Sequence, residues 1–125
     1  MNLCQVTLPC FDYDESVAFY SDMGFTLIVA SPTRYARFEC ESGATFSLHI
    51  HDQDEAAIGA VVVYFETDDL DDKVAELKAL GFKFEVEPTD QPWLWREAYL
   101  RDPAGNRICL FQAGENRRNP PWRVS

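Results

Sequence analysis

Basic residues are scarce in this chain, which has 11 Lys and Arg against 21 Asp and Glu and a formal net charge of −10. Such a charge repels phosphate backbones and anionic membrane surfaces, so we expect neither nucleic acid nor a membrane as a partner. It favours a cationic ligand, although acidity also serves solubility alone. The sequence also lacks an apolar run long enough to span a bilayer and the basic and apolar segment of a signal peptide. We therefore expect a cytoplasmic protein.

Several short motifs of known chemistry are missing as well. The four cysteines, Cys4, Cys10, Cys40 and Cys109, form no CxxC pair. Their scatter argues against a zinc ribbon or a dithiol redox site and predicts reduced, mostly buried thiols. There is no P-loop, no dinucleotide fingerprint and no Ser-His-Asp order. The segment DPAGN at residues 102–106 joins two predicted strands, so it is interpreted as a turn and not as a phosphate cradle.

A repeated 14-residue pattern is the most informative feature that is present. Residues 12–25 read DYDESVAFYSDMGF and residues 69–82 read DLDDKVAELKALGF, an offset of 57. Internal repeats fix an architecture before other signals are weighed. We expect one domain over residues 1–125, divided as follows: module one 1–52, linker 53–59, module two 60–113 and a Pro-rich tail 114–125. The tail is expected to lie across the body or a partner subunit.

Each copy of the repeat predicts an amphipathic helix, over residues 13–23 and 70–80, ended by Gly24 and Gly81. Candidate capping residues precede both helices: Asp12 or Asp14 for the first, and Asp68 or Asp69 for the second. Alternating segments predict strands at roughly 3–9, 25–30, 34–40, 44–51, 60–66, 82–87, 94–101 and 106–112. The order strand, helix, three strands therefore occurs twice and indicates the α+β class.

The predicted strands have two unlike faces. One is nearly all aliphatic and should lie under the helices. The other mixes aromatic and polar side chains, as a concave ligand site does, although a half-solvated sheet face has the same composition. Its candidate ligand-binding residues are Gln5, Ser47, His49, Tyr64, Trp95, Glu97, Tyr99, Cys109 and Phe111.

Trp95 and Tyr99 are suited to stack on a planar or cationic ligand, and Glu97 to neutralise an amine. Aromatic packing at a sheet edge or dimer interface is an equally good interpretation of these rings. His49 is a candidate hydrogen-bonder or proton acceptor near neutral pH. His49 and Glu97 are therefore the candidate catalytic residues.

The duplicated βαβββ order, with DYDESVAFYSDMGF in the first copy and DPAGNRICLF closing the second, resembles the vicinal oxygen chelate superfamily of glyoxalases, bleomycin-resistance proteins and extradiol dioxygenases. The resemblance covers the chain up to about residue 113. It implies two βαβββ modules forming an open, barrel-like mixed sheet around a cleft. It also implies a homodimer, with the cleft inside one chain or shared between subunits.

Enzymes of that superfamily hold a divalent metal at four equivalent strand positions, usually with His or Gln on the first strand and Glu on the last strand of each module. Aligning the two copies places these positions at Gln5, Ser47, Val62 and Cys109. A catalytic metal needs about three protein ligands of the His or carboxylate kind, and this set falls short. We therefore expect no resident cofactor, although a divalent metal stays possible.

Two functions from different classes follow. The first is a small-molecule binding protein of the bleomycin-resistance type that works without the usual metal in an aromatic, acidic cleft. The alternative is a metal-dependent lyase, isomerase or transferase of the lactoylglutathione-lyase type with an atypical site. Such a displaced site would take Gln5, His49 and one of the two carboxylates Glu66 and Glu97. A regulatory or structural dimer with a filled cleft is a third possibility.

Overall fold

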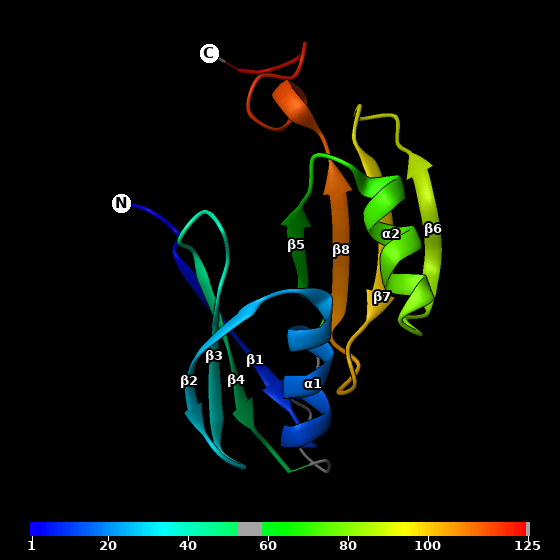
Figure 1. Cartoon of the computed structure of the whole chain (residues 1–125). Coiled ribbons are helices and arrows are strands. Elements are labelled where there is room, and N and C mark those ends of the chain that lie inside the picture. Colours follow the sequence, from blue (N-terminus) through cyan, green and yellow to red (C-terminus); the bar gives the residue numbers. More distant parts are fainter. Residues whose placement is uncertain (53–58, 125) are drawn as a thin grey trace. The chain divides into compact units, whose positions relative to one another are not determined.

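The computed structural model describes residues 1–52 and 59–124, so most of the expected linker at 53–59 lies outside the described residues. Figure 1 shows the order strand, helix, three strands twice, which confirms the predicted α+β fold of two βαβββ modules. Module one contains β1 (Gln5–Cys10), α1 (Tyr13–Met23), β2 (Thr26–Ser31), β3 (Tyr35–Glu39) and β4 (Thr45–Ile50). Module two contains β5 (Val62–Glu66), α2 (Leu70–Ala79), β6 (Phe84–Asp90), β7 (Arg96–Arg101) and β8 (Arg107–Gln112). A short 3-10 helix, η1 (Gly114–Arg117), follows.

Each module forms one open, four-stranded mixed sheet. The strand orders are β1-β4-β3-β2 and β5-β8-β7-β6, so the strand before the helix runs parallel to the last strand of its module. Thr7 pairs with Ser47 in the first sheet, and Tyr64 pairs with Cys109 in the second. These two pairs occupy the same place in each copy, which confirms the alignment of Ser47 with Cys109 made from the repeat.

The helix ends follow the capping residues of the repeat. Asp12 accepts a hydrogen bond from the Glu15 amide and begins α1, and Asp69 does the same for the Asp72 amide of α2. Gly24 and Gly81 follow the helices with φ of 110° and 99°, a left-handed backbone that only glycine adopts without strain. The second helix ends one residue earlier than predicted, at Ala79, and Leu80, which follows it, is 61% exposed.

The chain divides into two compact units, residues 1–60 with 102–106 and residues 61–101 with 107–125. In the first unit, Tyr20 lies against Phe38 and Phe46, whose rings stack 5.2 Å apart. In the second unit, α2 covers one face of the sheet and buries Leu70, Val74 and Leu77. The buried sheet residues of this unit include Ala98, Leu100, Ile108 and Leu110. The aliphatic strand face predicted from alternation therefore faces the helix.

The turn of the DPAGN segment belongs to the first unit, although its residues come from module two. The buried Asp102 carboxylate accepts hydrogen bonds from the Tyr20 hydroxyl at 2.6 Å and from the Asn106 side chain at 2.8 Å. It also accepts from the backbone amides of Ala104 and Asn106. The side-chain Nδ2 of Asn106 in turn donates to the Pro9 carbonyl at 2.8 Å. The segment is a turn, as predicted, and its carboxylate organises a buried polar network.

Burial of the thiols follows the prediction only in part. Cys10 and Cys109 are buried, whereas Cys40 is half-buried and Cys4 is exposed, and all four are free. Cys4 precedes the first residue of β1, at the exposed end of that strand. Within the described part of the chain, no helix is long and apolar enough to cross a bilayer.

Candidate functional site

Three aromatic rings gather on the face of the second sheet opposite α2. Trp95 and Phe111 stack with centroids 4.5 Å apart at 14°. Tyr64 meets both rings edge-on, at 6.1 Å from Trp95 and 5.9 Å from Phe111. Tyr64 is 47% exposed, whereas Phe111 is buried. The cluster therefore has a buried base and an exposed aromatic edge. We call Tyr64, Trp95, Glu97, Tyr99 and Phe111 the aromatic face.

Glu97 provides a negative charge at the base of the aromatic face. It lies opposite Phe111 in the register of β7 and β8 and is only 2% exposed. Its two carboxylate oxygens are held by separate donors, the Trp93 indole nitrogen at 2.8 Å and the Tyr99 hydroxyl at 2.7 Å. A buried carboxylate costs free energy unless donors satisfy it, and these two donors do so. Glu97 therefore acts as a fixed charge that other side chains separate from solvent.

Tyr99 and Cys109 complete the surroundings of this carboxylate. The Arg107 guanidinium lies over the Tyr99 ring, 4.5 Å from its centroid. Burial, followed by the hydrogen bond to Glu97, raises the pKa of Tyr99. Burial, followed by the charge of Glu97, raises the pKa of the Cys109 thiol to about 12. Cys109 is therefore a neutral thiol at neutral pH, because the thiolate would be both desolvated and repelled.

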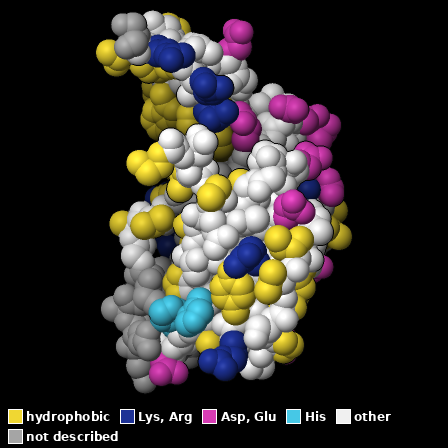
Figure 2. All heavy atoms as spheres, turned by 90° about the vertical axis from the view of Figure 1, so that its left-hand side faces the viewer, with side chains coloured by type: hydrophobic (Ala, Val, Ile, Leu, Met, Phe, Trp, Pro, Cys, Tyr) yellow, Lys and Arg dark blue, Asp and Glu magenta, His cyan; other side chains and the backbone are white. Residues whose placement is uncertain are grey.

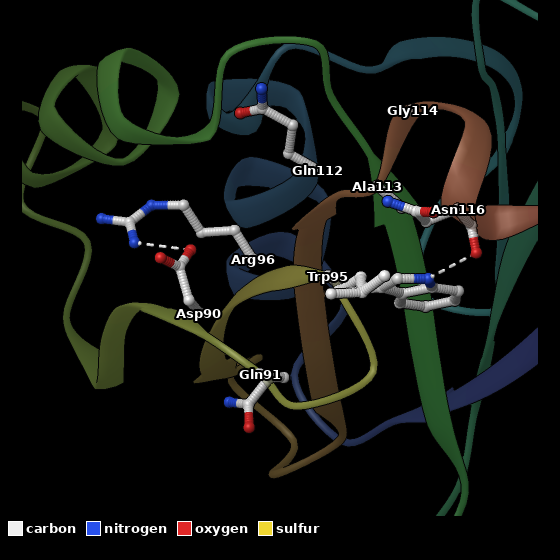
Figure 3. Close-up of a pocket in the computed structure, with 9 residues that line it drawn as sticks. Asp90, Gln91, Trp95, Arg96, Gln112, Ala113, Gly114 and Asn116 are labelled. Atoms are coloured by element: carbon white, nitrogen blue, oxygen red, sulfur yellow. Dashed lines mark hydrogen bonds and ion pairs between the residues drawn. The ribbon is translucent and has the colours of Figure 1, made fainter. Parts of the chain in front are cut away.

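A surface pocket of about 550 Å³ opens beside Trp95, between the β6–β7 turn and η1. Figure 3 shows the Trp95 indole nitrogen directed at the Asn116 carbonyl, to which it donates at 3.1 Å, and the pairing of Arg96 with Asp90 at 3.0 Å. Arg96 is also paired with Asp71 at 2.9 Å. The pocket is lined by Asp90, Gln91, Leu94, Trp95, Arg96, Gln112, Ala113, Gly114 and Asn116. Trp95 thus belongs both to the aromatic face and to the pocket wall.

The corresponding face of the first sheet is polar. Gln5 and Thr45 are opposite each other in the register, and the Gln5 side-chain oxygen accepts from the Thr45 hydroxyl at 2.8 Å. Ser47 is fully buried, and its hydroxyl is hydrogen-bonded to that of Thr7 at 2.7 Å.

Tyr35 extends this polar group. The pKa of its phenol is lowered, first by the hydrogen bond with Ser47 and then by Arg37, whose Nε donates to the Tyr35 hydroxyl at 3.0 Å. Sequence reasoning missed Tyr35 and Arg37. The alternation of β3 could have revealed both residues, because it puts them on one face of the strand. Once the strand order is known, that face lies beside His49 and Ser47.

The two histidines lie together on the surface of the first module. Their ring centroids are 5.4 Å apart, and Figure 2 shows the two side chains in contact with solvent on one face. His49 is exposed and His51 is half-buried. Both follow Ser47 at two-residue steps, so they lie on the same face of the strand as Ser47.

The four family-equivalent metal positions do not carry a suitable set of donors. Val62 has no donor atom, and the oxygens of Gln5 and Ser47 are engaged with Thr45 and Thr7. Cys109 would have to lose a proton that its surroundings retain. No group of three His, Cys, Asp or Glu side chains suited to a metal occurs among residues 1–52 and 59–124. Of the two carboxylates considered for a displaced site, Glu66 pairs with Arg117 at 3.3 Å and Glu97 is held by Trp93 and Tyr99.

A βαβββ module that occurs twice, each copy with an open mixed sheet, defines a class of α+β protein. Comparison with known proteins identifies the family within this class. Residues 2–110 match the model of the Glyoxalase/Bleomycin resistance protein/Dioxygenase superfamily, and the chain belongs to that family. It is 28% identical over 126 aligned residues to the uncharacterized protein YraH of Bacillus subtilis, covering 90% of this chain and 98% of that protein.

Solved structures share the fold. A lactoylglutathione lyase from Agrobacterium tumefaciens has a TM-score of 0.77 at 22% identity, covering 94% of this chain and 96% of its own. A family member from Nocardioides has a TM-score of 0.79 at 24% identity, covering 100% and 90%. A bleomycin-binding protein in complex with bleomycin has a TM-score of 0.73 at 21% identity, covering 90% and 98%. At these identities the likeness concerns the fold alone.

Proposed function

We propose that this protein binds a small, flat, cationic molecule on the aromatic face and does so without the usual catalytic metal of its family. The observation that carries the proposal is the buried Glu97 carboxylate, which lies opposite Phe111 in the strand register, within the same sheet as the cluster of Tyr64, Trp95 and Phe111. Aromatic rings near a negative charge suit a ligand that combines a ring system with an amine. The net charge of −10 would add attraction for a cation at long range.

The exposed edge of the cluster supplies the first contact in this proposal. Tyr64 offers an exposed ring, and Trp95 presents its indole between the cluster and the 550 Å³ pocket. In this proposal Glu97 acts through Tyr99 and Trp93, which both donate a hydrogen bond to its carboxylate. The negative charge polarises these two side chains, so they attract a cation more strongly. Binding of this kind sequesters the ligand and requires no bond to be made or broken.

Each module contributes further proposed ligand-binding residues, taken separately. In module one these are Gln5, Ser47 and His49, which offer hydrogen-bonding groups, and in module two they include Cys109 and Phe111, which offer apolar surface. His49 and Glu97 stay the proposed proton-transfer residues for the case that the ligand is turned over. We also propose that the chain is a single cytoplasmic domain that forms a homodimer, for which the exposed apolar residues Leu27, Ile28 and Val29 on the edge strand β2 give support. A monomer mass in light scattering at high protein concentration would contradict the dimer.

Bleomycin is the probe for the binding proposal, because a protein of this fold has been solved in complex with it. Titrating it into the protein and following tryptophan fluorescence should give a saturable change at micromolar protein. Three tryptophans contribute to this signal, so Trp95→Phe and the matched control Trp122→Phe are titrated in parallel. The change should disappear in the first variant and persist in the second. A linear, non-saturating response of the parent protein would remove the proposal.

The metal-dependent alternative is separated by a second measurement. Protein purified without chelator is analysed for metal and then supplied with zinc, nickel or manganese. Stoichiometric metal combined with lyase activity toward a hemithioacetal of glutathione would favour the alternative over the binding protein.

A further inference from the structure

The histidine pair of module one has the geometry of a chelate. His49 is the fifth residue of β4 and His51 follows the end of that strand, so the two side chains emerge on one face of the sheet. Their ring centroids are 5.4 Å apart with an interplanar angle of 69°. Metal–nitrogen bonds of bound imidazoles are about 2.0–2.1 Å, which places the ring centres of two imidazoles on one tetrahedral ion roughly 5 Å apart. The observed separation of the two ring centres is close to this value.

The backbone beneath the pair is fixed. His49 lies between Pro9 of β1 and Tyr35 of β3 in the sheet register. The Ile50 amide donates to the Arg34 carbonyl at 3.0 Å, and the His51 amide donates to the Cys10 carbonyl at 2.9 Å. The backbone at both histidines is therefore held in place before any metal binds. Such preorganisation lowers the entropic cost of binding.

We propose that His49 and His51 form a bidentate site for a borderline first-row divalent ion, namely Cu²⁺, Ni²⁺ or Zn²⁺. Imidazole nitrogen suits these ions, whereas Mg²⁺ and Ca²⁺ prefer oxygen. Two protein ligands leave open positions for water or for donor atoms of a small molecule. The net charge of −10 favours the approach of a dication. This site differs from the family-equivalent positions Gln5, Ser47, Val62 and Cys109, and it does not rest on the proposed ligand binding.

Isothermal titration of chelator-treated protein with Ni²⁺ tests the site directly. One ion should bind per chain, and His49→Asn and His51→Asn should each weaken binding by about tenfold or more, because the second imidazole acts at high effective concentration only when both are present. The double variant should bind no more tightly than either single variant. Mg²⁺ should give no heat above dilution.

Cu²⁺ electron paramagnetic resonance provides a readout that a merely structural role would not change. The parent protein should show coupling to two imidazole nitrogens, and each single variant should show coupling to one. Thermal unfolding of the metal-free variants should stay cooperative, which shows that a loss of metal binding is not a loss of the fold. Either single variant retaining the parent's Ni²⁺ affinity, or a parent spectrum with fewer than two imidazoles, would overturn the proposal.

Discussion

Glu97 is the residue on which the binding proposal depends most. Its carboxylate is 2% exposed and lies 2.7 Å from the Tyr99 hydroxyl and 2.8 Å from the Trp93 indole nitrogen. Glu97→Gln keeps the shape of the side chain and removes its charge. We expect the affinity for bleomycin to fall by about tenfold, since a buried charge acting on a cation is worth of the order of 1–2 kcal/mol.

Glu41→Gln is the control for this change, because Glu41 is an exposed carboxylate of the turn after β3. It removes the same formal charge from the chain without touching the aromatic face. Fluorescence titration of both variants separates local from long-range electrostatics. Equal loss in both variants would assign the effect to net charge alone.

Cys109 links the same surroundings to alkaline stability. Burial raises the pKa of Cys109 to about 12, whereas the thiol of an unfolded chain has its ordinary pKa of 9.0. Between these values the unfolded chain releases a proton that the folded chain keeps, so stability falls as pH rises, by about 1.4 kcal/mol per pH unit within this window. Cys109→Ala should be less stable than the parent at pH 8 because it leaves a cavity. Urea unfolding should then show that the difference in free energy of unfolding between the parent and Cys109→Ala becomes smaller from pH 9 toward pH 12. A difference that stays constant over this range would contradict a neutral buried thiol.

At the scale of the elements, the helix caps carry the clearest expectation. The Glu15 amide donates to Asp12 at 3.0 Å, and that bond satisfies one of the free amides at the start of α1. Asp12→Ala should lower the free energy of unfolding by about 1 kcal/mol. Asp22→Ala in the last turn of the same helix is the matched control and should be neutral or slightly stabilising, because an acidic residue there opposes the helix dipole. Chemical denaturation measures both, and equal losses would argue against the cap.

The elements themselves could be predicted because each depends on local spacing. Alternation located all eight strands, and the Asp and Gly residues of the repeat located both helix ends. Aligning the last strands of the two copies through Gly43 and Gly105 also matched Ser47 with Cys109 correctly, since a duplicated module keeps its register. Residue type and spacing along one strand contain this information.

The environment of the site residues could not be predicted in the same way. Alternation placed Ser47 and Glu97 on the mixed face, but it did not show that Thr7 and Tyr99 would engage them. Those contacts depend on partners from other strands or on side-chain rotamers. For the same reason the sequence did not indicate Tyr35 and Arg37 as site residues. It also predicted only a Pro-rich tail where the structure has η1.

For the whole molecule, the buried contact between Tyr20 and Asp102 matters most. These residues are 82 positions apart in the sequence, and their hydrogen bond is 2.6 Å long within the first compact unit. Asp102, a residue of module two, therefore completes the buried core of the first compact unit. Tyr20→Phe and Asp102→Asn should each lower the free energy of unfolding by about 1–3 kcal/mol, because each leaves a buried polar group short of a partner.

A double-mutant cycle tests whether the two residues act on each other. The two changes together should cost less than the sum of the single changes, with a coupling of about 1 kcal/mol or more. Additive losses would mean that Asp102 stabilises only its own turn through Ala104 and Asn106. Equilibrium unfolding in urea gives all three values.

The central claim, that the protein binds a cationic aromatic molecule without a resident metal, is tested most directly by one calorimetric titration. Metal-free bleomycin is titrated into protein treated with a chelator, with the chelator kept in both solutions. We predict saturable heat at micromolar concentration. Metal-independent binding would be contradicted if heat of binding were seen only after zinc, nickel or manganese had been supplied, or if no saturable heat were seen under either condition.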